Sequence, residues 1–179
     1  GAEACDHFTF VIAGDGCLSE GVSHEAASLA GHLGLGRLVV IYDDNHITID
    51  GETDLALSDD APARFRAYGW DVDEIGEVAN DLDALESALD RAKGIDDKPT
   101  LIVLRSHIGF PSPDHTDDHE AHGLAFDAAD IGRTKDVMGI PDEPFYVPEE
   151  VVDFYRAAGG RGSDARAAWH ERNPDGPPA

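Results

Sequence analysis

Two short stretches near the start of the chain combine glycines with oxygen-bearing side chains. Gly14-Asp15-Gly16 directly follows one apolar run, and Asn45 lies just past a second one. Glycines let a ligand approach the backbone closely, and carboxylate and amide oxygens are hard ligands that suit Mg²⁺ shared with phosphate oxygens. These residues therefore predict a magnesium-dependent anion site, which a backbone carbonyl just after Asn45 would complete.

The elements around these residues would bring them together. Residues 8–13 and 38–42 are short, β-rich apolar runs that predict buried strands. Residues 19–35 between them repeat apolar positions at helical spacing. This strand–helix–strand order is typical of a parallel sheet, where ligands bind outside the carboxyl ends of the strands. The helix, capped by Ser19, would direct its free N–H groups at an anion held there.

Context decides how much weight the Gly-Asp-Gly sequence carries. A bare Gly-Asp-Gly is weak evidence, because the same residues also form ordinary turns. The position after a strand, with an asparagine just past the following strand, is much more specific. We therefore interpret the two stretches as one site rather than as a turn and an unrelated loop residue.

The remaining pattern predicts an α/β fold, with a parallel sheet flanked by helices. Further strands are expected at 70–75 and 100–105, and helices at 61–68, 82–93, 125–138 and 149–158. Residues 106–123 form a long loop rich in Pro, His and Asp, and loops of this length inside compact domains are usually functional. We expect a partial domain over residues 1–158 and a mobile linker or tail over residues 159–179.

Charge narrows the range of partners. The chain has 37 acidic and 13 basic residues, for a formal net charge of −24. Such a field repels nucleic acid and anionic membranes, so we expect neither as a partner. A phosphorylated ligand stays compatible, because a bound cation and helix N-termini reverse the local potential. The acidic composition fits a solvated surface in a salty cytoplasm or a bias of the whole lineage equally well.

Apolar runs and cysteines indicate the compartment. The longest apolar run, residues 38–42, is far below the ~20 residues of a membrane-spanning helix, and no signal-peptide pattern opens the sequence. Cys5 and Cys17 form neither a disulfide framework nor a CxxC pair. We therefore expect a reducing, cytoplasmic setting. The first residue is Gly1 rather than Met, which is compatible with a fragment or a processed piece of a longer protein.

Three segments resemble one enzyme family. The thiamine diphosphate motif of transketolases closely resembles GDGCLSEGVSHEAASLAGHLGLGRLVVIYDDNHITIDG, whose YDDNHITIDG half is the more diagnostic. The resemblance continues through IGFPSPDHTDDHEAHG and TKDVMGIPDEPFYVPEEV and covers roughly residues 8–157. It implies part of the thiamine-diphosphate-binding fold, from the N-terminal, diphosphate-binding domain of a transketolase, as a fragment or a split subunit.

The resemblance implies the cofactors and the metal ligands. They are thiamine diphosphate and Mg²⁺, with Ca²⁺ or Mn²⁺ as substitutes. Asp15 and the Asn45 side chain would bind the metal together with the Ile47 backbone carbonyl. Gly14 and Gly16 would lie against the diphosphate.

Three further residues gain roles from the same resemblance. Ile49 would pack against the cofactor ring. His122 resembles a histidine that contacts the diphosphate near the reacting centre, and Glu20 resembles a glutamate that couples two cofactors across a dimer interface. Without the family, His122 reads equally well as a solvated loop histidine.

The activity implied by the resemblance is ketol transfer, a step of the pentose phosphate pathway. A two-carbon unit would pass from a ketose phosphate to an aldose phosphate, with this chain supplying the diphosphate and magnesium anchor. A pyrimidine-binding domain or partner chain would supply the rest, in a homodimer or a split hetero-oligomer, and the chain alone is expected to be inactive. The alternatives are a subunit of another thiamine diphosphate enzyme (a 2-oxo acid dehydrogenase or synthase) and a catalytically inactive solitary domain.

The long loop departs from the family and allows a second interpretation. His107, Pro111 and Asp114 stand where many relatives have Thr, Gly and Asn. The loop is also rich in metal-ligand residues, whose spacing is compatible with a zinc site: His115, Asp117, Asp118, His119, Glu120 and His122. We rank this below the cofactor role, because the cysteines of structural zinc sites are absent.

Overall fold

The computed structural model describes residues 6–123 and 125–176. The chain divides into two compact units, one formed by Phe8–Met138 and the other mainly by residues 139–179. We describe each by itself.

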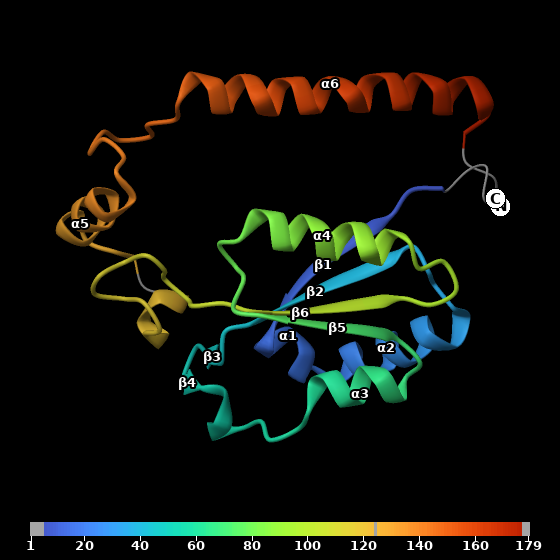
Figure 1. Cartoon of the computed structure of the whole chain (residues 1–179), viewed down its shortest axis with the longest axis horizontal. Helices are drawn as coiled ribbons and strands as arrows, with labels where there is room; N and C mark the ends of the chain where they lie inside the picture. Colours follow the sequence, from blue (N-terminus) through green and yellow to red (C-terminus); the bar gives the residue numbers. More distant parts are fainter. Residues whose placement is uncertain (1–5, 124, 177–179) are drawn as a thin grey trace. The chain divides into compact units, whose positions relative to one another are not determined.

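A four-stranded parallel sheet forms the centre of the first unit (Figure 1). Its order is β1 (Thr9–Gly14), β2 (Leu38–Asp44), β6 (Thr100–Arg105) and β5 (Asp71–Gly76), and each neighbouring pair is parallel. The expected α/β architecture and the parallel pairing of the first two strands are confirmed. Parallel pairing brings the carboxyl ends of all four strands to one edge of the sheet, which is where a ligand site is expected.

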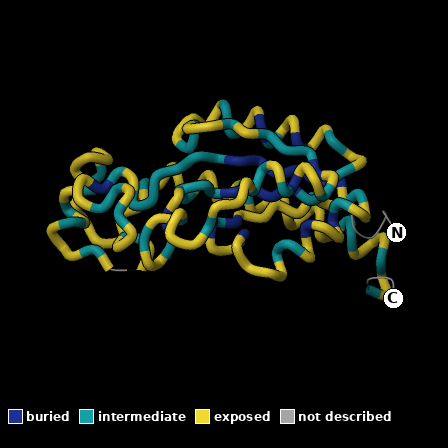
Figure 2. Tube along the Cα trace, turned by 90° about the horizontal axis from the view of Figure 1, so that it is seen from below, coloured by how far each residue is buried: buried dark blue, intermediate teal, exposed yellow. Residues whose placement is uncertain are grey.

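Helices cover both faces of this sheet. On one face lie α2 (Gly21–Leu33) and α3 (Ala61–Ala67), and on the other lies α4 (Leu82–Lys93) (Figure 1). Val40 packs among residues of the first face, whereas its neighbour Val39 packs against α4. Successive strand residues point to opposite faces, so a sheet covered on both sides needs continuous apolar runs. Figure 2 shows the buried residues concentrated along these central strands.

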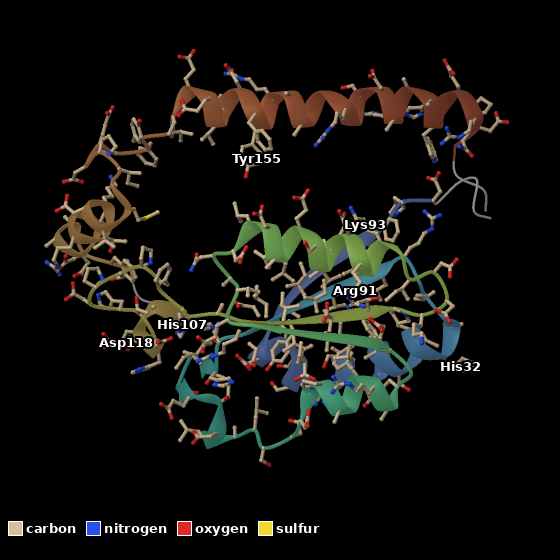
Figure 3. The ribbon with its side chains drawn as sticks, viewed as in Figure 1. His32, Arg91, Lys93, His107, Asp118 and Tyr155 are labelled. Atoms are coloured by element: carbon tan, nitrogen blue, oxygen red, sulfur yellow. The ribbon has the colours of Figure 1, made fainter. Side chains whose placement is uncertain are left out.

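Polar contacts fasten the helices at their ends. The carboxylates of Asp60 and Asp81 accept backbone N–H bonds at the starts of α3 and α4, as N-cap residues do. Arg91, on α4, forms ion pairs with Asp71 and Asp73 of β5 at 3.0 and 2.8 Å (Figure 3). The edge strand β5 is therefore held by the helix that covers it.

Two helices follow β1, and the second of them corresponds to the helix expected at 19–35. The first, α1, spans Asp15–Ser19, and α2 begins at Gly21 after Glu20, whose backbone is extended (φ −67°, ψ 137°). The Ser19 hydroxyl donates to the Gly16 carbonyl at 2.8 Å and so lies within α1 instead of capping α2. A residue with extended ψ cannot continue a helix, so the N-terminus of α2 lies a full turn beyond the end of β1. α2 ends where Gly34 adopts the left-handed conformation after Leu33.

Short elements follow the strand ends. The chain leaving β2 forms a small hairpin of β3 (Ile47–Thr48) and β4 (Gly51–Glu52), followed by the 3₁₀ helix η1 (Thr53–Leu55). The loop after β6 contains the 3₁₀ helix η2 (His119–His122), which contacts β3, and ends at α5 (Ala128–Met138). Segments from distant parts of the sequence therefore meet at the carboxyl edge of the sheet.

The second unit is built on one long helix. α6 spans Glu149–Arg172, whereas the sequence predicts an end near residue 158. Gly159, Gly160 and Gly162 lie within it, and the Ala and Arg residues around them are strong helix formers that offset the glycine cost of about 1 kcal/mol each. The division into a domain up to residue 158 and a mobile tail stays a prediction. Among the described residues, no helix combines the length and apolarity that crossing a bilayer requires.

Apolar side chains remain exposed on two elements of the first unit. On β1, at one edge of the sheet, Phe10 is 48% and Ile12 is 76% exposed. On α2, Val22 is 70% and Leu33 is 57% exposed. Monomeric proteins rarely expose apolar side chains in contiguous groups, so these elements are candidates for contact with other parts of a larger protein.

A matched pair of glycine substitutions tests how α2 packs. A Cβ at Gly31 would lie 1.9 Å from the Tyr68 carbonyl oxygen, whereas a Cβ at Gly21, on the same helix, meets no atom within 4 Å. We expect Gly31→Ala to lower the free energy of unfolding by about 1–3 kcal/mol or more, because the backbone must shift. Gly21→Ala should be neutral or stabilising by about 0.4–1 kcal/mol. Urea denaturation of the two variants is the measurement, and equal stabilities would contradict the packing.

Candidate functional site

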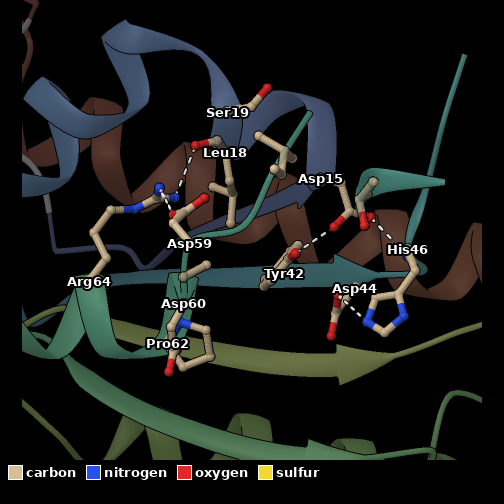
Figure 4. A pocket seen from close by; sticks show the side chains of 13 residues that line it. Asp15, Leu18, Ser19, Tyr42, Asp44, His46, Asp59, Asp60, Pro62 and Arg64 are labelled. Carbon is tan, nitrogen blue, oxygen red and sulfur yellow. Dashed lines mark hydrogen bonds and ion pairs between the residues drawn. The ribbon is translucent and has the colours of Figure 1, made fainter. Parts of the chain in front are cut away.

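The Asp15 carboxylate joins the ends of β1 and β2. Gly14, the last residue of β1, pairs with Asp43 of β2, and Asp15 follows it with only 5% of its surface exposed. The Tyr42 hydroxyl donates to Asp15 Oδ1 at 2.5 Å, and the His46 backbone N–H donates to Asp15 Oδ2 at 3.1 Å (Figure 4). One side chain at the first strand end therefore binds residues on both sides of the Asp43–Asn45 segment.

Asn45 faces the turn that follows β2. Its Oδ1 accepts the Ile47 backbone N–H at 2.9 Å, and Ile47 is buried. Both residues line a cavity of about 350 Å³, whose wall also includes Arg105 and Asp117. Because His46 binds Asp15 directly, the carboxylate lies beside the backbone that carries the two other expected ligands. That Asp15, Asn45 and Ile47 hold one metal ion stays a prediction.

Burial makes the ionised form of Asp15 costly. Desolvation raises the pKa of Asp15 above its ordinary value of 3.8, and the nearby charge of Asp44 raises it further, whereas the hydrogen bonds from Tyr42 and His46 lower it. Burial and the neighbouring Asp15 carboxylate raise the pKa of Tyr42 as well, so its hydroxyl stays protonated as a donor. A cation would offset the repulsion between Asp15 and Asp44.

The site leaves space for a ligand beside its glycines. Among the described residues, chain neighbours aside, a Cβ added at Gly14 or Gly16 would meet no atom within 4 Å, so the backbone there is open to close approach. The desolvated Asp15 carboxylate, the Asn45 side-chain oxygen and the open glycine backbone fit a divalent cation shared with a diphosphate. The residues present are therefore suited to the cofactor that the sequence motif implies.

A second cavity, of about 210 Å³, adjoins Asp15 on the side of α3 (Figure 4). Arg64 reaches across it from α3, donating to the Leu18 carbonyl at 3.0 Å and pairing with Asp59. His24 Nε2 lies 3.3 Å from the same guanidinium. Sequence reasoning singled out neither Tyr42 nor Arg64. The position of Tyr42 at a strand end was an available signal, whereas nothing in the helical pattern of residues 61–68 distinguishes Arg64.

Three expected site residues lie at the rim. Glu20 is exposed between α1 and α2, Ile49 is 70% exposed, and His122 is exposed in η2. Contact between η2 and β3 places the His122 turn next to Ile47 and Thr48. Gly14, Asp15 and Gly16 are thus brought to the end of β2, whereas Glu20, Ile49 and His122 face outward, and their roles stay predictions.

Two of the long-loop residues that depart from the family pattern, His107 and Asp114, have side-chain partners nearby. His107 Nδ1 lies 2.9 Å from both carboxylate oxygens of Asp117, and Asp114 accepts from Arg133 Nε at 2.7 Å. The buried Ser112 hydroxyl accepts the His115 N–H at 3.2 Å. Side-chain contacts therefore close the loop on itself and hold it to α5.

The fold and the strand-end site together define a thiamine-diphosphate-binding domain. A family model described as "Transketolase, thiamine diphosphate binding domain" matches residues 1–175. The chain belongs to this transketolase family, and thiamine diphosphate is the cofactor of the domain.

Individual transketolases show the same likeness. The chain is 44% identical to a transketolase from Nostoc over 97% of its own length and 26% of the relative. A transketolase structure from Leishmania mexicana is 38% identical with a TM-score of 0.87, covering 93% of this chain and 25% of that one. A Pichia stipitis transketolase variant in complex with fructose 6-phosphate is 41% identical with a TM-score of 0.84, over 94% and 26%. The chain thus spans about a quarter of the length of its relatives.

The hydrogen bond between Tyr42 and Asp15 can be tested by its removal. We expect Tyr42→Phe to lower the free energy of unfolding by about 1.5–3 kcal/mol at neutral pH, because a buried carboxylate loses a donor. The hydroxyl stabilises the ionised form, so the penalty should be present above the raised pKa of Asp15 and should shrink as the pH falls through it. Denaturant titrations at neutral and acidic pH measure this difference.

Tyr68→Phe is the matched control, since the Tyr68 hydroxyl lies 3.5 Å from a histidine nitrogen, His24 Nδ1, instead of a carboxylate. A loss of stability as large and as pH-dependent as that of Tyr42→Phe would contradict the assigned interaction.

Proposed function

We propose that this chain supplies the diphosphate and magnesium anchor of a transketolase, an enzyme that transfers a two-carbon ketol unit from a ketose phosphate to an aldose phosphate. The observation that carries the proposal is the buried Asp15 carboxylate at the end of β1, hydrogen-bonded to Tyr42 and His46 at the end of β2. This junction lies within the matched thiamine diphosphate binding domain.

Asp15, Asn45 and the Ile47 carbonyl hold the metal ion in this proposal. The raised pKa of Asp15 supports it, because a cation stabilises the ionised carboxylate that burial disfavours. The hard oxygen ligands favour Mg²⁺, and Ca²⁺ or Mn²⁺ can occupy the same ligand set. The Ile47 N–H bond to Asn45 Oδ1 keeps these two residues together before metal binds.

Gly14 and Gly16 face the diphosphate, and their open backbone supports this role. Ile49 packs against the cofactor ring and His122 contacts the diphosphate, which gives their exposed side chains a partner. Thiamine diphosphate itself supplies the carbon nucleophile and the electron sink for breaking and forming the C–C bond. The residues of this chain position the diphosphate end of the cofactor, and the metal ion that they hold neutralises its negative charge.

The remaining parts of the active site lie with partners. The aminopyrimidine end of the cofactor needs an activating carboxylate, which we assign to a pyrimidine-binding domain or a partner chain in a homodimer or a split hetero-oligomer. The exposed apolar residues Val22, Leu29 and Leu33 of α2, which follow the interface candidate Glu20, support contact there. A role in the pentose phosphate pathway and a cytoplasmic location complete the proposal, the latter supported by the scarcity of cysteine.

Cofactor binding tests the metal anchor. We expect Asp15→Asn to weaken the Mg²⁺-dependent binding of thiamine diphosphate by at least about tenfold, or about 1.4 kcal/mol, since a charged ligand of the metal is lost. Asp83→Asn, on the exposed start of α4, is the matched control and should bind as the wild type does. Isothermal titration calorimetry with and without Mg²⁺ gives the readout, and unchanged binding by Asp15→Asn would refute the anchor.

Ketol transfer tests the activity. A polypeptide of these 179 residues alone is expected to show no turnover with thiamine diphosphate and Mg²⁺, because Asp15, Asn45 and the glycines hold only the diphosphate end of the cofactor. A chimera in which the chain replaces its matching stretch of the Nostoc transketolase should transfer ketol units between sugar phosphates, and the chimera carrying Asp15→Asn should not.

Two outcomes of these assays would contradict the proposed role of the chain as a diphosphate and magnesium anchor. Turnover by the 179 residues alone would place an activating base within the chain. The second outcome is a chimera that folds and binds the cofactor but is inactive, while the unmodified Nostoc enzyme is active. That result would indicate that the chain belongs to another thiamine diphosphate enzyme or is an inactive domain.

A further inference from the structure

The loop between β6 and α5 brings together three metal-ligand groups. One ligand atom each from His115, Asp118 and Glu120 lies within 4.8 Å of the other two. Figure 3 shows Asp118 on this loop beyond the strand ends. These residues are separate from Asp15, Asn45 and Ile47, so the proposed cofactor site does not account for them.

His115 is oriented for ligation through Nδ1. Its Nε2 lies 3.3 Å from Asp130 Oδ2 of α5, and its ring stacks on Phe126 with centroids 4.6 Å apart. Asp130 is itself held by Arg133. A metal-binding histidine commonly donates its other ring N–H to a carboxylate, which fixes the tautomer and the ring orientation. The contact with Asp130 has this form and leaves the lone pair on Nδ1.

That Nδ1 atom is buried and has no hydrogen-bond partner within the described part of the chain. Asp118 Oδ2 is the facing group, at 3.8 Å. Buried polar atoms are nearly always paired. The unpaired His115 Nδ1, which faces the Asp118 carboxylate, therefore indicates a place for a ligand between them. A cation between the two atoms would satisfy both.

The two carboxylates are arranged to complete such a site. Asp118 Oδ1 caps the start of η2 by accepting the Glu120 N–H at 3.0 Å, and it also meets His119 Nδ1 at 3.2 Å. Oδ2 is thereby directed to His115. The Glu120 side chain is exposed and extends from the next turn, so it can close on an ion without disturbing the core.

We propose that His115 Nδ1, Asp118 and Glu120 form a binding site for a divalent transition-metal ion, with Zn²⁺ as its natural probe. One imidazole and two carboxylates favour such ions over Mg²⁺, which prefers oxygen ligands alone. Tetrahedral Zn²⁺ with bonds of about 2.0–2.2 Å places its ligand atoms about 3.3–3.6 Å apart. The Nδ1–Oδ2 separation of 3.8 Å is close to this, and the exposed Glu120 supplies the remaining movement.

Metal binding here would clamp the turn that carries His122. Glu120 and His122 both belong to η2, and η2 contacts β3 of the diphosphate site. An ion joining His115 to Asp118 and Glu120 fixes the start of that turn. The site therefore offers a way to hold the outward-facing His122 segment in one position. The inference does not rest on the proposed function, and its test uses no cofactor.

The experiment titrates Zn²⁺ into the 179-residue chain in the presence of millimolar Mg²⁺, which occupies hard-oxygen sites. Calorimetry should show one equivalent bound, and Co²⁺ should give the visible absorption of a low-coordinate nitrogen–oxygen site. Glu120→Gln and Asp118→Asn should each weaken binding by at least about tenfold, and Asp130→Asn, which disturbs the orientation of His115, by about 10–100-fold.

Matched controls separate this site from the others. His32→Ala, an exposed histidine at the end of α2, should bind Zn²⁺ as the wild type does, and Asp15→Asn should also leave Zn²⁺ binding intact. Amide hydrogen exchange should slow over residues 115–123 when Zn²⁺ is added. Absence of Zn²⁺ binding, binding unaffected by Glu120→Gln and Asp118→Asn, or binding lost in Asp15→Asn would each overturn the proposal. Because Glu120 is exposed, loss of folding does not confound its variant.

Discussion

The Asp15 carboxylate is the junction on which the arrangement of the strand ends depends. It is almost fully buried, and it is held by a hydroxyl from β2 and by an N–H from the residue after Asn45. His46 adopts a positive φ of 63° to make this bond, a conformation that costs an L-residue about 1–2 kcal/mol. The charged hydrogen bond offsets that cost. Charge at Asp15 thus maintains a turn whose geometry determines where Asn45 and Ile47 lie.

The same carboxylate would link stability to ligand binding at the proposed site. Burial and Asp44 oppose its ionisation, and a cation bound there would offset that opposition. Active sites commonly contain such perturbed groups. In this chain the hydrogen bond from Tyr42 reduces the free-energy cost of ionising the buried Asp15. Tyr42 belongs to the hydrophobic core, so packing positions its hydroxyl independently of any ligand.

The local spacing of apolar residues predicts the strands and helices well. It predicts contacts between side chains that are distant in the sequence poorly. The sequence predicts the continuous apolar strands because burial on both faces of the sheet leaves a direct mark on it. The sequence does not predict the short helix α1, because no apolar spacing marks the single extended ψ at Glu20 that separates it from α2. Likewise Arg64 on Leu18 and His115 between Asp118 and Asp130 arise from tertiary contacts that no periodicity encodes. α6 is longer than the predicted 149–158, because the good helix formers around its three glycines outweigh the cost of those glycines.

The exposed edge of the sheet has a consequence for the chain in solution. β1 presents Phe10 and Ile12 together with the unpaired backbone groups of an edge strand, a combination that invites strand-to-strand aggregation. A net charge of −24 opposes that association by mutual repulsion between molecules. Salt shortens the range of this repulsion to about 3 Å at molar ionic strength, whereas the apolar attraction persists. The colloidal stability of these 179 residues is therefore set by ionic strength, and a neighbour covering β1 would remove that dependence.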